Sequence, residues 1–288
     1  MRFAAILWRF WAARGHLSEG RGWLEAILAL AVPDGPIEPL RRAMLLHVTA
    51  NLTRTQGDYA HAEALYAECL AIRRAHNDPH GILSALHNLG ITAYEQGDHT
   101  RAIQLYEEAL PLARAEGSGY GIAFILTTLG EAVQADGDPA RALALYEEGL
   151  AAFRQIGHIW GIALALTRLG DATLAHGDRT RAAALQRESL ALSGELGDRR
   201  SATDAIEGLA RAEAPRDPAL AIRLLGAAAT LRERLGVPAT AAREALTDRA
   251  AALARTQLGE EAFAAAWATG TVLRFEDLRA RIHPDERA

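Results

Sequence analysis

Hydrophobic residues recur at helical spacing over most of the chain. In the segment RAIQLYEEAL, residues 101–110, Glu107 and Glu108 lie opposite a face formed by apolar residues three or four positions apart: Ala102, Leu105, Tyr106, Ala109 and Leu110. Residues 82–93 follow the same period, and the alternating patterns typical of strands are absent from the sequence. The pattern therefore predicts pairs of amphipathic helices.

Short breaks between these helices return every 40 residues. Gly-Asp pairs stand at 57–58, 97–98, 137–138 and 177–178, and a second glycine series occupies 81, 121 and 161. Glycine suits the left-handed residue that ends a helix, and the aspartate after it can accept hydrogen bonds from the first N–H groups of the next helix. An internal period of this length indicates stacked helical units. We therefore expect helices to turn at Gly57, Gly97, Gly137 and Gly177.

The order of large and small residues within each unit resembles the tetratricopeptide repeat. The resemblance rests on these positions: Leu86, Leu89, Gly90, Ala93, Ala102, Tyr106 and Ala109. The next copy, at 126–149, shows the same pattern. It implies an all-α solenoid, a right-handed superhelix of antiparallel helix pairs, in which Gly90 and Ala102 let two helices approach closely. The period of 40 residues exceeds the usual 34, and Arg114 and Arg154 stand where proline usually ends the unit.

The repeat pattern divides the chain into three parts. Residues 1–37 read as a divergent N-terminal helical repeat, and residues 38–235 as about five tetratricopeptide-like units. Residues 236–288 read as a C-terminal helical cap, because a stacked array needs a last element with a polar outer face.

A narrower resemblance extends over nearly the whole chain. The segments at 7–30, 197–214, 221–236 and 258–270 are similar to the C-terminal helical region of bacterial regulators related to the signal-transduction ATPases with numerous domains, including regulators of the LuxR or AfsR type. The resemblance implies the sensor part of such a regulator, because the chain has no G-x-x-x-x-G-K-[ST] motif. An ATPase-containing regulator, in cis or in trans, is the implied partner. Met1 falls where such a chain would already be under way, so we expect a fragment or a separately encoded remnant.

Composition narrows the class of partner. The formal net charge is −5, without a basic patch, so we expect no direct binding to nucleic acid. Cys69 is the only cysteine, which excludes an internal disulfide and fits a reducing compartment. The apolar segment 1–15 is interrupted by Arg9 and is too short to span a bilayer, which favours a first amphipathic helix. We expect a cytoplasmic protein without membrane contact.

No group of residues predicts catalysis. The segment GSGYG at 117–121 resembles a phosphate loop but follows no predicted strand. His76 and His80 flank an Asp-Pro pair that breaks the helix needed to bring them onto one face, and Cys69 occupies a core position of the repeat. We therefore expect no enzymatic activity, no cofactor and no bound metal.

Positions at which the copies differ indicate a binding surface. Core positions repeat because every unit stacks in the same way, whereas the first helix of each unit, which lines the groove of tetratricopeptide arrays, varies here. We predict that the groove binds a partner through these residues: His47, Asn51, Arg54, His87, Asn88, Tyr94, Phe124, Thr127, Glu131, Arg168 and Asp171. The alternative interpretation stays open: these residues could be polar simply because a groove exposed to water is polar, without any ligand.

One known use of such a groove does not fit these residues. Asn51 and Asn88 match the asparagine positions of a clamp for a peptide's terminal carboxylate. The cationic positions of that clamp hold His47, Phe124 and Thr128 instead, so little positive charge is available to pair with a carboxylate. We therefore do not expect a chaperone-tail clamp.

The sequence thus predicts a non-catalytic binding and sensing module that engages a protein or peptide through its groove. The alternative from another class is a receptor for a small effector, such as a sugar or a nucleotide.

Overall fold

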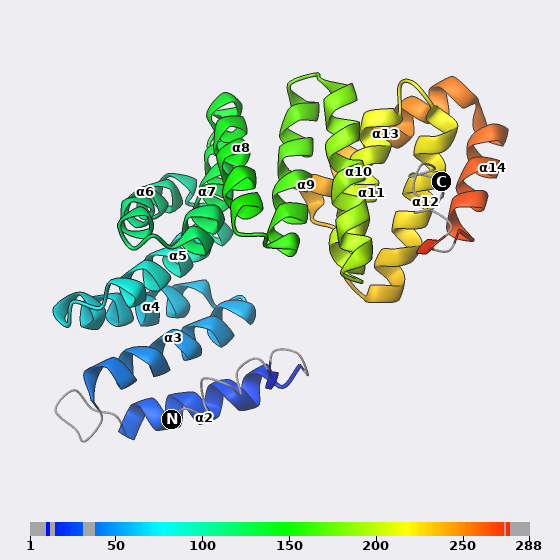
Figure 1. The fold of residues 1–288 in the computed structure, drawn as a ribbon. Coiled ribbons are helices and arrows are strands. Elements are labelled where there is room, and N and C mark those ends of the chain that lie inside the picture. The colour runs from blue at the N-terminus through cyan, green and yellow to red at the C-terminus, as the bar shows by residue number, and fades with distance from the viewer. Residues whose placement is uncertain (1–9, 12–14, 31–37, 274, 277–288) are drawn as a thin grey trace. The chain divides into compact units, whose positions relative to one another are not determined.

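The computed structural model describes residues 10–11, 15–30, 38–273 and 275–276. Over these residues every regular element is a helix, and no strand occurs (Figure 1). The expected all-α fold of stacked helix pairs is therefore confirmed. Most of the first expected helix, within residues 1–15, lies outside the described residues, as does the expected boundary at residue 37.

The repeats are built from helices of equal length. Each of α3 to α10 has 17 residues and is followed by a three-residue turn, which accounts for the period of 40: α3 (Pro39–Thr55), α4 (Tyr59–Ala75), α5 (Pro79–Glu95), α6 (His99–Ala115), α7 (Gly119–Ala135), α8 (Pro139–Gln155), α9 (Ile159–Ala175) and α10 (Arg179–Glu195). The other helices are α2 (Leu17–Leu30), α11 (Arg199–Glu213), α12 (Pro218–Leu235), α13 (Ala241–Leu258) and α14 (Glu260–Thr271).

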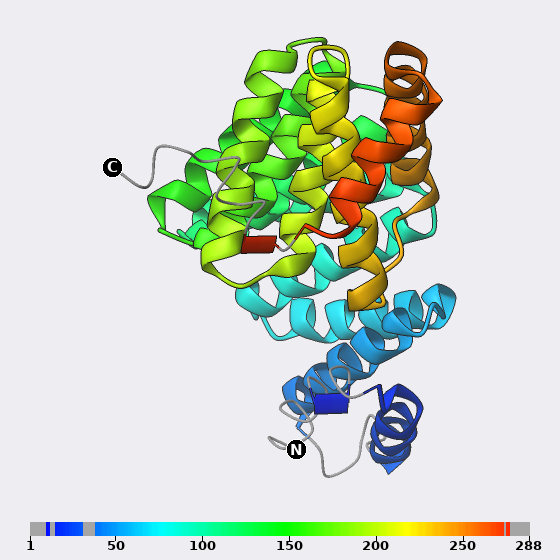
Figure 2. The ribbon, with the colours of Figure 1, turned by 90° about the vertical axis from the view of Figure 1, so that its right-hand side faces the viewer.

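The chain divides into two compact units after Asp138. Unit 1, residues 1–138, contains α2 to α7, and each of these helices packs against the next. Unit 2, residues 139–288, contains α8 to α14; here α12 packs against α11, α13 and α14, and α14 lies beside α12 in Figure 2. We call α3, α5, α7, α9 and α11 the A helices, and α4, α6, α8, α10 and α12 the B helices.

The turns between A and B helices have the predicted chemistry. Gly57, Gly97, Gly137 and Gly177 all have a positive φ, between 82° and 97°. Asp98 caps α6 by accepting a hydrogen bond from the backbone N–H of Arg101 at 2.9 Å. The corresponding aspartates, Asp58 and Asp178, cap α4 and α10. These local interactions end one helix and begin the next at the same point of every repeat.

A close contact between a small and a large residue joins α5 to α6 and α9 to α10. A Cβ built on Gly90 of α5 would lie 2.4 Å from Cε1 of Tyr106, whose ring is buried on α6. The expected close approach at Gly90 is therefore confirmed. On α10 the position of the tyrosine is held by Gln186, which is also fully buried and contacts Gly170. The same packing position thus carries a buried aromatic ring on α4, α6 and α8 and an amide on α10.

We predict that Gly90→Ala lowers the free energy of unfolding by about 1–3 kcal/mol, because the new methyl group would overlap a ring that has no room to move. Chemical denaturation followed by circular dichroism measures this change. Gly22→Ala is the matched control: Gly22 lies within α2, and a Cβ there would meet nothing within 4 Å. The control should be neutral or stabilising by up to ~1 kcal/mol. Equal stability of wild type and Gly90→Ala would refute the packing argument.

Candidate binding surface

The predicted binding residues all lie on A helices, but they fall in both units. Nine belong to unit 1, on α3, α5 and α7, and the other two, Arg168 and Asp171, belong to α9 in unit 2. We call the surface formed by these positions in unit 1 the aromatic face, and the surface formed by α9, α11 and the start of α13 in unit 2 the ionic face. Their chemistry differs.

On α3, two of the predicted residues hold the repeats together. Asn51 Oδ1 accepts a hydrogen bond from the buried hydroxyl of Tyr66 at 2.6 Å, so this asparagine binds a B helix. Arg54 Nη1 donates to Glu95 Oε1 at 2.7 Å and thereby joins α3 to α5. Burial raises the pKa of Tyr66 to about 12, so its hydroxyl stays protonated and remains a donor.

A cavity of about 330 Å³ opens between α5 and α7 on the aromatic face. Two predicted residues, His87 and Phe124, line it together with Tyr120. The Tyr120 ring is 55% exposed and packs beside Phe124, with 4.4 Å between the ring centroids. Other lining residues include Leu83, Ser84 and Ile125. The cavity therefore combines an aromatic wall with a few polar groups, which is the usual composition of a ligand site.

The two histidines of the aromatic face are electrically neutral near pH 7. Burial lowers the pKa of His47 to about 4, and the positive charge of Arg73 acts in the same direction. Burial also lowers the pKa of His87 to about 4, with a further contribution from Arg54. Each ring has a nitrogen sealed from water without a hydrogen-bond partner in the described part of the chain, Nδ1 of His47 and Nε2 of His87. These histidines therefore behave as packing groups.

The remaining predicted residues of unit 1 differ in how much surface they offer. Thr127 is 1% exposed and donates to the backbone oxygen of Ala123, so it can contribute little to a ligand contact. Asn88 is partly exposed and donates through Nδ2 to the backbone oxygen of Ser84. The partly exposed Tyr94 packs beside His99, with 5.2 Å between centroids, and Glu131 is partly exposed on α7. Sequence reasoning missed Tyr120, because it lies in the first turn of its helix.

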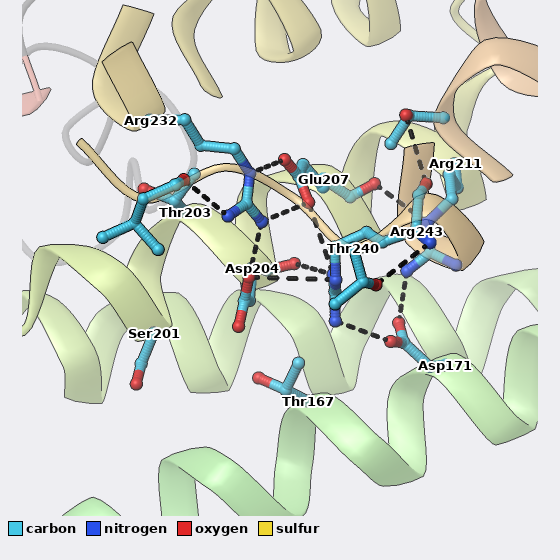
Figure 3. A network of polar contacts seen from close by, with 12 residues as sticks. Thr167, Asp171, Ser201, Thr203, Asp204, Glu207, Arg211, Arg232, Thr240 and Arg243 are labelled. Atoms are coloured by element: carbon cyan, nitrogen blue, oxygen red, sulfur yellow. Dashed lines mark hydrogen bonds and ion pairs between the residues drawn. The ribbon is translucent and has the colours of Figure 1, made fainter. Parts of the chain in front are cut away.

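The ionic face is organised around three carboxylates. Asp171 on α9 accepts from Gln186 Nε2 at 2.8 Å and pairs with Arg211 on α11 at 2.5 Å (Figure 3). Arg243, on α13, reaches the same carboxylate at 3.4 Å. Arg168 is partly buried and lines a cavity next to this network. Of the two residues predicted here, Asp171 thus forms part of an extended ion-pair network.

Two arginines from outside the A helices complete the network. Arg232 on α12 bonds Asp204 at 2.7 Å and Glu207 at 2.6 Å, and the hydrogen bond to Glu207 is the main cause of its raised pKa. Arg243 also approaches Glu207 at 3.4 Å. Removing one member of such a buried network leaves an uncompensated charge, which costs several kcal/mol. Repeat comparison missed Arg232 and Arg243, because neither occupies a repeated groove position.

The described residues contain no group of three or more His, Cys, Asp or Glu placed to hold a metal ion. Cys69 is buried as expected, and burial raises the pKa of its thiol above the ordinary value. None of the helices in the described part of the chain is both long enough and apolar enough to cross a membrane.

A family model of the tetratricopeptide repeat matches residues 41–115 and 81–155. The chain therefore contains tetratricopeptide repeats, as the pattern of large and small residues predicts. No curated protein sequence matches the chain.

Solved structures with the same fold are distant in sequence. A signal-transduction ATPase with numerous domains from Pyrococcus horikoshii, described as having a tetratricopeptide repeat sensor, has a TM-score of 0.71 and 14% identity, over 97% of this chain and 43% of that protein. BtubC from P. vanneervenii has a TM-score of 0.58 and 21% identity, over 85% of this chain and 91% of that one. NprR in complex with its cognate peptide NprX has a TM-score of 0.56 and 16% identity, over 99% and 74%.

The low pKa values of His47 and His87 predict acid sensitivity. Histidines of the unfolded chain, with an ordinary pKa of 6.5, take up protons as the pH falls, whereas the folded chain resists protonation until about 4. Stability is therefore greatest above pH 6.5 and declines as the pH falls towards 4, by roughly 1.4 kcal/mol for each pKa unit of difference at each histidine. Urea unfolding at a series of pH values measures this decline.

The double variant His47→Gln, His87→Gln is the control for this prediction. It lacks both titrating groups, so its stability should vary less steeply with pH over the same range. Parallel pH profiles for wild type and double variant would assign the acid sensitivity to other groups.

Proposed function

We propose that the chain is a non-catalytic binding and sensing module that engages a protein or peptide through the aromatic face of unit 1. The observation that carries the proposal is the cavity between α5 and α7, where the adjacent, mutually tilted rings of Tyr120 and Phe124 form an aromatic wall beside His87. More than half of the Tyr120 side chain is exposed, so a partner can contact it without any rearrangement of the core. Tyrosine is among the residue types most often found as anchors of protein interfaces.

The chemistry of this cavity favours an apolar or aromatic side chain as the part of the partner that enters it. Its volume of about 330 Å³ accommodates one large side chain. His87, the histidine of the wall, has a pKa of about 4 and carries no charge near pH 7, so it gives no electrostatic preference for a terminal carboxylate. Asn88, which follows His87, and Tyr94, about two turns further along α5, are partly exposed and extend the proposed contact surface away from the cavity.

The structural neighbours agree with this class of function. NprR is described in complex with a peptide, and the Pyrococcus protein is described as having a tetratricopeptide repeat sensor. At 16% and 14% identity the likeness concerns the fold alone, so peptide binding by this chain rests on its own cavity. The same proposal includes an ATPase-containing regulator as partner, in cis or in trans, and a cytoplasmic location. It also includes the absence of a cofactor and of direct binding to nucleic acid.

A second candidate function is sensing of a small effector. The observation that favours it is the size of the same cavity, which lies at the lower end of the range of small-molecule sites. A sugar or a nucleotide base could stack on Phe124 in place of a peptide side chain. Competition between such a compound and a bound peptide would separate the two candidates.

A randomised peptide library displayed on phage tests the main proposal with the chain as it is. We expect enriched peptides to share an aromatic or large aliphatic residue. Phe124→Ala or Tyr120→Ala should weaken the selected peptides by about tenfold or more, because truncating an interface anchor costs roughly 2 kcal/mol. Fluorescence anisotropy measures the affinity, and circular dichroism shows whether each variant stays folded.

The matched control is the double variant Glu107→Ala, Glu108→Ala on α6, since both residues are exposed and lie on a B helix away from the cavity. It should bind the selected peptides as wild type does. The proposal fails if no peptide is enriched, or if the α6 variant loses binding while Phe124→Ala and Tyr120→Ala retain it.

A further inference from the structure

A second cavity, of about 270 Å³, lies on the ionic face of unit 2. Its wall comes from α9, α11 and α12 and from residues 237–246, which lead into α13 and form its first turns. Figure 3 shows Arg211, Arg232 and Arg243 entering this region from three different helices. The cavity is separate from the aromatic cavity, which belongs entirely to unit 1.

Positive charge exceeds negative charge around this cavity. Among the described residues, three carboxylates are paired with Arg211, Arg232 and Arg243: Asp171 and Asp204 in the wall and Glu207 behind it. The exposed Arg200 adds a positive charge that none of these carboxylates offsets. The five arginines that line the cavity are Arg168, Arg200, Arg211, Arg232 and Arg243.

The carboxylates hold arginines in place without using all their donors. Arg211 is only 7% exposed; its Nη2 donates to Asp171 and its Nε to the backbone oxygen of Glu207, but its Nη1 has no acceptor among the described residues. The guanidinium group of Arg200 on α11 likewise has no acceptor in the described part of the chain, and it lies at the exposed side of the cavity. Because neither Arg211 Nη1 nor the Arg200 guanidinium group is sealed from solvent, both can donate to a ligand that enters the cavity.

A helix N-terminus adds to the positive potential. Thr240 caps α13 and lines the cavity together with Ala242 in the first turn. The first backbone N–H groups of a helix have no acceptor within the helix, and the helix dipole makes this end positive. Converging guanidinium groups and a helix N-terminus together are the usual chemistry of an oxyanion site.

We propose that this cavity binds a small oxyanion with at least two negative charges, carried by phosphate or carboxylate groups. Arg200 and Arg211 donate to it from α11, and the start of α13 closes over it. Bound anion connects α13 to α9 and α11, so it raises the stability of unit 2. The site and its ligand are independent of the peptide proposed for unit 1.

Isothermal titration calorimetry on the full chain tests the site with two probes, inorganic pyrophosphate and citrate. We expect at least one to bind with a dissociation constant below about 1 mM at low salt, and binding to weaken as salt screens the charges. A response to pyrophosphate alone identifies a phosphate ligand, and a response to citrate alone a carboxylate ligand. Sodium chloride at matched ionic strength is the blank.

Three variants locate the binding. Arg200→Ala removes an exposed side chain that has no contact to lose, and Arg211→Lys keeps the charge next to Asp171 but removes the spare Nη1 donors; each should weaken binding by about tenfold. Asp204→Asn makes the wall more positive and should tighten binding. The control, Arg234→Ala, removes an exposed arginine of α12 outside the cavity and should change nothing.

The site is refuted if neither probe binds the wild-type chain. It is also refuted if Arg234→Ala weakens binding as much as Arg200→Ala does, because the anion would then respond to the overall charge of the surface. Weaker binding of both probes to a folded Asp204→Asn variant would also contradict the proposal, because removal of a negative charge from the wall of an anion site should tighten binding.

Discussion

The close contact between a small residue on one helix and a large residue on its neighbour determines how the repeats are built. Where Gly90 meets Tyr106, the backbone of α5 comes within reach of a buried ring, and the two helices can pack side by side along their length. Because that contact uses one stripe of the A helix, the residues on the remaining stripe can differ from repeat to repeat. The two faces described above are made of residues from this variable stripe.

The two units use the same positions for opposite chemistry. In unit 1 the tyrosine hydroxyl of Tyr66 bonds an A-helix asparagine, and the histidines nearby are held neutral by burial. In unit 2 the amide of Gln186 bonds Asp171, so polarity extends from the core to the surface, where Arg211 and Glu207 continue it. One substitution in the packing position thus accompanies a change from an apolar to an ionic surface.

The sequence predicts the features that arise from short-range interactions. The turns at Gly57 and Gly97, the cap at Asp98 and the small position at Gly90 each depend on residues a few positions apart or one helix apart, which a repeated pattern makes visible. Arg243 could not be placed in this way, because it meets Asp171 across 72 residues from a helix outside the repeats. The repeats contain no contact that corresponds to the packing of α13 against the A helices, so the repeated pattern could not predict it. The grouping of the predicted residues into two faces likewise required knowledge of which side chains are buried.

The equal length of the helices has an evolutionary consequence. Each block of 40 residues carries its own turns, caps and both halves of the small-to-large contact. Duplication or loss of one whole block therefore tends to leave neighbouring interfaces with a matching partner, since the units of a repeat array pack mainly against their neighbours. Gain or loss of a few residues within a helix would rotate the later positions of that helix around its axis. Such a gene is expected to change its length in whole blocks, while single-residue changes alter the exposed stripe and hence the ligand.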